Sequence, residues 1–220
     1  MEANFFGPGY DGAVLEDQGM NDLIQFQNSH VGPFGNTLVG DGVKGPQTMW
    51  ALALAEHHPA RQAIVLRGLS HVGAEESPLG SNRGILQDKW LARCGVPIPP
   101  PGVPAPQNAW CAAFASWCVS VDGLPEVKLA LVRDLVEHFP SVEFDYVLPG
   151  DLGYVLRKDG TGHVWIITGR QGTETMNVEG NTGNRVAVTR RGQARYLRTV
   201  SAPMLPGIPA GVPFAVSQTR

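Results

Sequence analysis

Near the middle of the chain lies the run Trp110-Cys111-Ala112-Ala113-Phe114-Ala115-Ser116-Trp117-Cys118. Its apolar residues predict a buried helix, and the proline-rich residues 97–106 before it cannot be helical, so the helix should open at Cys111. A thiol at a helix start lies beside unpaired backbone N–H groups and the positive end of the helix dipole, which favour the thiolate. Cys111 is therefore a candidate nucleophile. The alternative is a thiol that packs in the core as a small apolar side chain.

The composition predicts a folded protein of one large or two small domains. The chain has 220 residues, 43% of them hydrophobic and 17% charged, and a formal net charge of -3. This charge predicts no nucleic-acid partner, and the apolar runs are too short to span a membrane. Three cysteines without a Cys-x-x-Cys pair argue against a disulfide framework and a zinc ribbon. We therefore expect no metal, no cofactor and no membrane contact.

The order of the patterns predicts an α+β fold, with helices first and an antiparallel sheet afterwards. Helices are expected around residues 22–26, after Pro46, and over 61–69, 85–95, 111–118 and 126–138. From Pro149 the apolar period changes to two, which predicts strands at 152–156, 163–168, 175–178, 186–189 and 196–200, with a hairpin turn at 158–162. Residues 201–220 have no period and predict a proline-rich tail.

Residues 1–60 predict a small all-α domain. Phe26-Gln27 is followed by a loop with the pattern Asp-Gly-x-x-Gly-Pro-x-Thr at 41–48, and then by Trp50-Ala51-Leu52. The loop glycines permit left-handed turns, and Asp41 can accept bonds from nearby backbone N–H groups. This pattern resembles the helical peptidoglycan-binding domain of many wall hydrolases. The resemblance implies that Asp41 and Gly42 belong to a substrate-binding loop, and the alternative is a generic helical hairpin.

The second half of the chain offers partners for a cysteine nucleophile, which needs a base in hydrogen-bond reach and a group that orients the base. His163 begins a predicted strand just after a turn, at the edge of a sheet, where its ring could point to the start of the cysteine helix. Glu179 and Asn181 end a later strand, and either could accept the other imidazole N–H and fix the tautomer.

The start of the cysteine helix also offers contacts for a substrate. The backbone N–H of Cys111 and the side chain of Asn108 or Gln107 are candidate donors to a tetrahedral oxyanion. Trp110 stands beside the nucleophile and could touch the substrate. Its spacing of seven residues from Trp117 also suits packing in the core.

These residues carry a second resemblance. Asn-Ala-Trp-Cys at 108–111, Pro-Gly-Asp before a strand, Gly-His-Val and Val-Glu-Gly-Asn look like the CHAP family of cysteine amidohydrolases and peptidases, over roughly residues 65–200. The resemblance implies a papain-like catalytic domain at 61–200. It also implies Cys111 as nucleophile, His163 as general base, Glu179 as the acid that orients the histidine, and Asn181 as a further polar residue of the site.

Both resemblances imply one polymer, so we expect a monomeric, endolysin-like enzyme whose partner is peptidoglycan and which cleaves an amide bond as an amidase or an endopeptidase. The first residues lack a signal-peptide pattern. We therefore expect synthesis in the cytoplasm and action at the cell wall after release through a holin or dedicated export. The alternatives are an inactive wall-binding or phage structural protein, a secreted wall-degrading toxin, and a zinc peptidase that uses the histidines.

Overall fold

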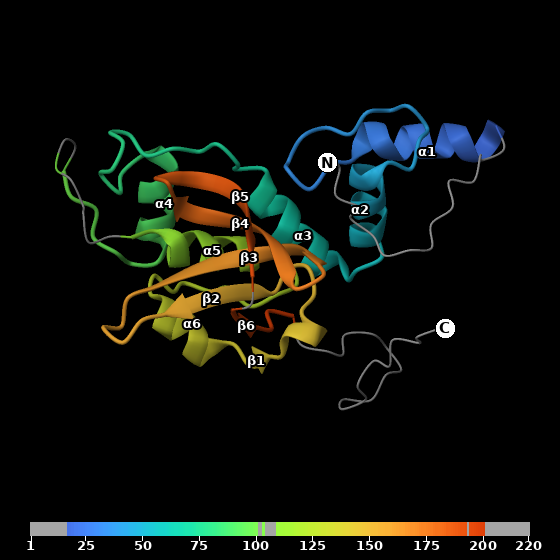
Figure 1. Cartoon of the computed structure of the whole chain (residues 1–220). Helices are drawn as coiled ribbons and strands as arrows, with labels where there is room; N and C mark the ends of the chain where they lie inside the picture. The colour runs from blue at the N-terminus through green and yellow to red at the C-terminus, as the bar shows by residue number, and fades with distance from the viewer. Residues whose placement is uncertain (1–16, 101–102, 104–108, 193, 201–220) are drawn as a thin grey trace.

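A computed structural model describes residues 17–100, 103, 109–192 and 194–200 (Figure 1). This part of the chain is an α+β structure, as the sequence predicts. The expected tail at 201–220 and the candidate donors Asn108 and Gln107 lie outside the described residues. The helices are α1 (Asp17–Ser29), α2 (Pro46–Ala55), α3 (Pro59–Leu69), α4 (Ile85–Arg93), α5 (Cys111–Val119), α6 (Val132–His138) and the 3-10 helix η1 (Phe144–Tyr146). The strands are β1 (Ser141–Val142), β2 (Leu152–Leu156), β3 (Gly162–Gln171), β4 (Glu174–Thr182), β5 (Arg185–Arg191) and β6 (Arg195–Leu197).

The strands of the described residues form one antiparallel sheet in the order β1-β6-β2-β3-β4-β5. The predicted strands at 152–156, 163–168, 175–178 and 186–189 are confirmed as parts of β2 to β5. The last predicted strand, 196–200, is shorter than expected and ends at Leu197. Strand β1 has only two residues, too few for a period-two pattern to reveal it.

The prediction of a helix over 126–138 is wrong for its first half, because α6 begins at Val132. Residues 126–131 instead form a loop that hydrogen-bonds to Ser116 of α5 and to Ser120, the residue that caps this helix. The Ser120 hydroxyl accepts from the Val127 N–H at 2.9 Å, and the Ser116 hydroxyl donates to the Leu129 carbonyl at 2.6 Å. These side-chain bonds satisfy backbone groups that a helix would pair internally.

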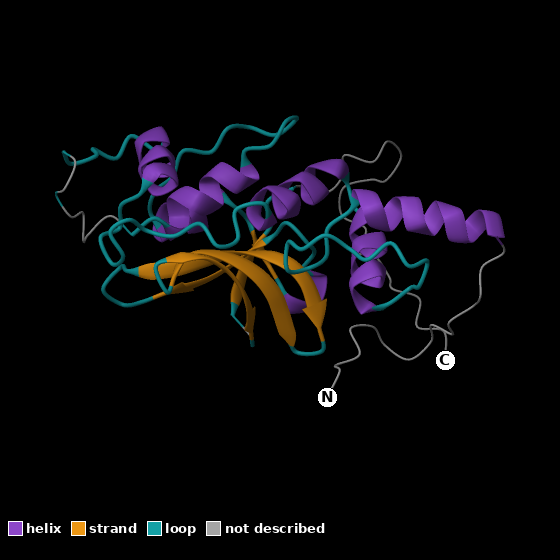
Figure 2. Cartoon of the chain, turned by 90° about the horizontal axis from the view of Figure 1, so that it is seen from above, coloured by secondary structure: helices purple, strands orange, loops and turns teal. Residues whose placement is uncertain are grey.

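The helices cover one face of the sheet. Figure 2 shows α3, α4 and α5 along one side of the strands, with α1 and α2 beyond one end. Val164, Ile166 and Val178 belong to the core cluster on this side, together with Phe114 of α5. Their neighbours in sequence alternate to the other face, where a smaller cluster contains Val147, Trp165, Ile167 and Tyr196.

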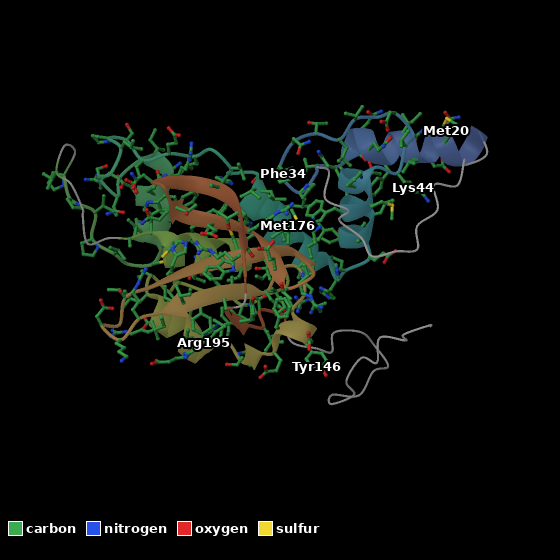
Figure 3. The ribbon with its side chains drawn as sticks, in the orientation of Figure 1. Met20, Phe34, Lys44, Tyr146, Met176 and Arg195 are labelled. Carbon is green, nitrogen blue, oxygen red and sulfur yellow. The ribbon has the colours of Figure 1, made fainter. Side chains whose placement is uncertain are left out.

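The N-terminal helices share the main core with the sheet. Trp50 of α2 is buried, and its indole Nε1 donates to the Thr168 carbonyl of β3 at 3.0 Å. Figure 3 places Met20 and Lys44 in this part of the molecule, and Tyr146 and Arg195 beside β1 and β6. Helix α1 extends back to Asp17, so Asp22 lies inside it. The domain boundary at residue 60 stays a prediction.

A buried ion pair ties the start of β2 to α3. Asp151 is fully buried, and its Oδ1 lies 2.8 Å from Nη1 of Arg61 and its Oδ2 3.3 Å from Nε of Arg198. Arg61 also donates to the Pro149 and Val200 carbonyls. Gly150 has a φ of +87°, and a Cβ there would lie 3.2 Å from the Arg61 Cα, so this close approach requires glycine. The Pro-Gly-Asp motif thus has a structural role.

Candidate active site

Cys111 is the first residue of α5, as the sequence predicts, and only 3% of its surface is exposed. The preceding residue, Trp110, caps the helix without a side-chain bond to its free N–H groups. Those N–H groups and the helix dipole therefore act on the thiol and on any group bound beside it.

Gly180 of β4 lets the start of α5 lie directly on the sheet. A Cβ at this position would come within 2.8 Å of Phe114 Cβ and of the Trp110 ring. No side chain larger than hydrogen fits there unless α5 moves away. The glycine of the Val-Glu-Gly-Asn motif thus sets the height of the cysteine helix above the strand that carries Glu179.

His163 is the second residue of β3, which lies between β2 and β4. The expectation that it lies at the edge of the sheet is therefore wrong, because β3 pairs with a strand on each side. Its Nε2 lies 2.8 Å from Oε2 of Glu179, and the Cys111 thiol lies close enough to its ring to raise the pKa of the imidazole. Since Nε2 faces the carboxylate, Nδ1 is the ring nitrogen available to the thiol.

The surroundings of His163 favour its protonated form. Burial acts to lower the pKa of His163, but the hydrogen bonds with Cys111 and Glu179 and the negative charges of both groups raise this pKa to about 9. At neutral pH the ring therefore carries a proton that it can donate.

Glu179 is fully buried, and its carboxylate accepts four hydrogen bonds from the residues that the structure describes. Nε and Nη2 of Arg191 approach Oε1 and Oε2, each at 2.6 Å, and the Thr189 hydroxyl donates to Oε1. His163 holds the remaining contact, on Oε2. Burial acts to raise the pKa of Glu179, but the bonds from Arg191, His163 and Thr189 lower this pKa to about 2. The carboxylate is thus ionised and fixed in direction.

Asn181 does not make the contact to His163 that Glu179 makes. Its Nδ2 donates to Oδ1 of Asn82 at 3.1 Å, which links β4 to the loop at residues 75–84. The residue has a φ of 58°, a conformation that asparagine tolerates better than most residues, at a register shift between Glu179 and Thr182. Of the two orienting groups that the sequence left open, Glu179 is the one in contact with the ring.

Trp110 is fully buried, so its side chain supports the site from within the core. It packs against Trp90, and its indole Nε1 donates to Oε1 of Glu76 at 2.9 Å. Glu76 is itself only 5% exposed and accepts on Oε2 from the Asn82 N–H. Glu76 therefore lies in the interior, and the expected contact of Trp110 with a substrate has no support in this burial.

Asp41 and Gly42 lie in the loop before α2, where they bond to α1 and not to the cysteine site. Asp41 accepts from the Val43 N–H and from Nε2 of Gln27, both at 2.9 Å, and these bonds lower its pKa. The Gly42 N–H donates to Oε1 of Gln27, and its φ is +71°. The expected local bonding of Asp41 is confirmed, while substrate binding by this loop stays a prediction.

Arg191 and Thr189 also belong to the site, and neither is among the residues predicted from the sequence. A signal was available in the alternation of β5. Thr189 and Arg191 are two apart, so they share one face of a strand that neighbours β4.

The contacts assemble a nucleophile, a base and an orienting acid from α5, β3 and β4. This combination supports acyl transfer by a thiol. Among the described residues no cluster of three or more histidine, cysteine, aspartate or glutamate side chains is arranged to hold a metal ion.

Comparison with models of known protein families and with characterised proteins found no match. Within the same described ranges, no helix has the length and apolar character needed to cross a bilayer.

Proposed function

We propose that this protein is a cysteine hydrolase of peptidoglycan, with a papain-like catalytic domain similar to the CHAP family. The observation that supports it most directly is the chain of contacts from the Cys111 thiol through His163 to the buried carboxylate of Glu179. A cysteine that serves only as core packing needs neither a histidine partner nor an acid that orients the histidine.

In the proposed first step, Sγ of Cys111 attacks the carbonyl carbon of an amide and forms a thioester. The C–N bond breaks, and the leaving nitrogen takes the proton of His163. In the second step the neutral His163 accepts a proton from water while the oxygen attacks the thioester, which releases the acid and restores the Cys111 thiolate beside a protonated His163. In this proposal the Cys111 N–H, at the start of the helix, donates to the oxyanion in both steps.

The choice of peptidoglycan rests on the N-terminal pattern. Gln27, Asp41 and Gly42 form one hydrogen-bonded unit, which fits the loop expected of a small helical wall-binding domain. In this proposal residues 1–60 bind the wall polymer, with Asp41 and Gly42 in the binding loop, and residues 61–200 cut it. The enzyme acts at the bacterial wall after release from the cytoplasm.

The test is the loss of turbidity of a purified peptidoglycan suspension, with two cysteine variants of the same helix. Cys111→Ala should keep the fold and abolish clearing. Cys118→Ala is the matched control, because Cys118 is fully buried and burial raises its thiol pKa well above the usual value. We expect it to clear the suspension after a loss of about 1 kcal/mol in the free energy of unfolding.

Equal clearing by wild type and Cys111→Ala would exclude the thiol mechanism. Activity that survives iodoacetamide but is lost in EDTA would favour a zinc peptidase. Wall binding without any clearing would favour an inactive binding protein. Mass spectrometry of the released fragments then separates the two reactions: a sugar-free peptide with a new N-terminal amine indicates an amidase, and a new amine within the stem or cross-bridge indicates an endopeptidase.

A further inference from the structure

Two cationic side chains share the buried carboxylate of Glu179. Arg191 binds it with two parallel N–H groups at 2.6 Å, and His163 binds Oε2 at 2.8 Å. An orienting acid needs only the histidine as its partner to do its work. The guanidinium is therefore an additional group, and the proposed mechanism does not use it.

The position of Arg191 is fixed by contacts on two sides. Its guanidinium carbon lies 4.5 Å from the centre of the Trp165 ring, and the ring of His163 lies 6.1 Å from the same indole. The side chain of Arg191 is 35% exposed, while the carboxylate that it binds is fully buried. Arg191 thus sits between Trp165 and Glu179 and presents its planar fork to the acid.

The groups around this carboxylate come from two strands and one helix. Arg191 and Thr189 approach from β5, and His163 from β3. Cys111, at the start of α5, acts on the same imidazole. The site therefore holds two acidic groups, the thiol and the carboxylate, and two basic groups, the imidazole and the guanidinium.

We propose that Arg191 is a positioning residue that clamps Glu179 and limits how tightly His163 holds its proton. The proposal rests on the proposed function in one respect, the role of His163 as the proton carrier. The bidentate contact fixes the direction of the carboxylate, and through it the ring tautomer that presents Nδ1 to the thiol.

The limiting effect follows from charge. When His163 loses its proton, a fully buried carboxylate remains, and an anion in that place is costly unless a cation stays beside it. Arg191 is that permanent cation. Without it His163 would hold its proton more tightly, and a ring that stays protonated cannot accept the proton of the water in the second step.

The test is an NMR titration of the His163 ring in protein labelled with 15N-histidine, with the signal assigned by its loss in His163→Ala. In Arg191→Met we expect the titration midpoint of His163 to rise above that of the wild type by on the order of one pH unit. A merely structural role predicts the opposite sign, because a loosened and hydrated site would bring the midpoint down from about 9 towards the ordinary value of 6.5.

Two further variants sharpen the result. Arg191→Lys keeps the charge without the fork, so its midpoint should lie near that of the wild type while the ring signal shows a mixture of tautomers. Arg190→Met removes the neighbouring charge, which is exposed on the other face of β5, and should leave the midpoint where it is. If Arg191→Met does not fold, Arg191→Gln removes the same charge and keeps an N–H donor.

A midpoint that stays or falls in Arg191→Met or Arg191→Gln would overturn the proposal, and so would an equal rise in Arg190→Met. The titration needs no peptidoglycan. A wild-type protein that clears no wall would therefore count against the proposed function alone, while the sign of the shift would still decide the role of Arg191.

Discussion

Two carboxylates of the sheet, Glu179 and Asp151, are equally buried and equally well paired, yet only one lies in a candidate active site. Asp151 binds Arg61 and Arg198, two permanent cations. Glu179 binds one permanent cation, Arg191, and one partner that can lose its charge, His163. The difference teaches that burial and pairing alone do not mark a functional acid. What distinguishes Glu179 is that one of its partners, His163, can lose its charge and also interacts with the candidate nucleophile Cys111.

The two regions share a second feature, a glycine next to the acid that admits a helix. Gly150 brings the Arg61 backbone of α3 close to Asp151, and Gly180 brings the start of α5 onto β4 beside Glu179. In one region the helix supplies a buried cation. In the other it supplies Cys111. A glycine that lets a helix approach the sheet thus stabilises the fold beside Asp151 and helps to form the candidate site beside Glu179.

The largest effect is expected from Glu179→Gln, which keeps the shape of the side chain and removes its charge. The ring of His163 then faces an amide in place of the carboxylate and loses the charge that stabilises its protonated form. We expect kcat/KM for wall clearing to fall by roughly 10²–10⁴-fold. A kcat/KM within a few fold of the wild-type value would mean that the role of Glu179 differs less from that of Asp151 than their partners indicate.

Asp151→Asn should act on the free energy of unfolding instead. Replacing one member of a buried ion pair leaves Arg61 without its charged partner, and such changes cost about 3–5 kcal/mol. Denaturant unfolding measures the loss, and clearing per folded molecule should stay at the wild-type level. If fully folded Asp151→Asn cleared peptidoglycan more slowly than the wild type, the Asp151 region would also shape the site.

Gly180→Ala tests the glycine on the active-site side. The added methyl group meets Phe114 and Trp110 at 2.8 Å, so α5 must shift and carry Cys111 with it. We expect a loss of roughly 10²-fold in kcat/KM, with about 1–3 kcal/mol of destabilisation from overpacking. Gly183→Ala is not a matched control because its φ is positive, whereas Gly192→Ala meets nothing within 4 Å and should be neutral.

Much of this comparison could be predicted from the sequence, because motifs report residues that are local in the chain. The start of α5 at Cys111 and the strand of His163 follow from periodicity and turns, whereas β4 continues past the predicted strand end at 178 and includes Glu179. Arg191 could not be assigned to the site in that way. Its role depends on which strand β5 pairs with and on the face that its side chain takes, and a run of arginines looks the same on a solvated face.

The same limit explains the errors. His163 lies in an inner strand because β3 pairs with both β2 and β4, and the strand pattern alone does not say which strands pair. Burial of Glu76 depends on its bond to Trp110, which lies 34 residues further along the chain. Contacts of this range are set by the packing of α5 on the sheet.

The last prediction concerns stability against pH, and it separates the two acids by their partners. The pKa of His163 is raised to about 9, so its stabilising contribution is complete below the ordinary value of 6.5 and is lost as the pH rises through 9. The pKa of Glu179 is lowered to about 2, so its contribution is complete above the ordinary 4.5 and is lost as the pH falls towards 2. Thermal unfolding of the wild type should therefore show a decline in Tm between pH 6.5 and 9.

Glu179→Gln should flatten that alkaline decline, because the charge that holds the His163 proton is gone. Asp151→Asn should lower Tm at every pH and leave the slope between pH 6.5 and 9 as it is in the wild type, since the partners of Asp151 are arginines, which keep their charge throughout this range. An equal flattening in both variants would break the comparison, because it would mean that the alkaline slope reports the net charge of the sheet and not the proton shared between His163 and Glu179.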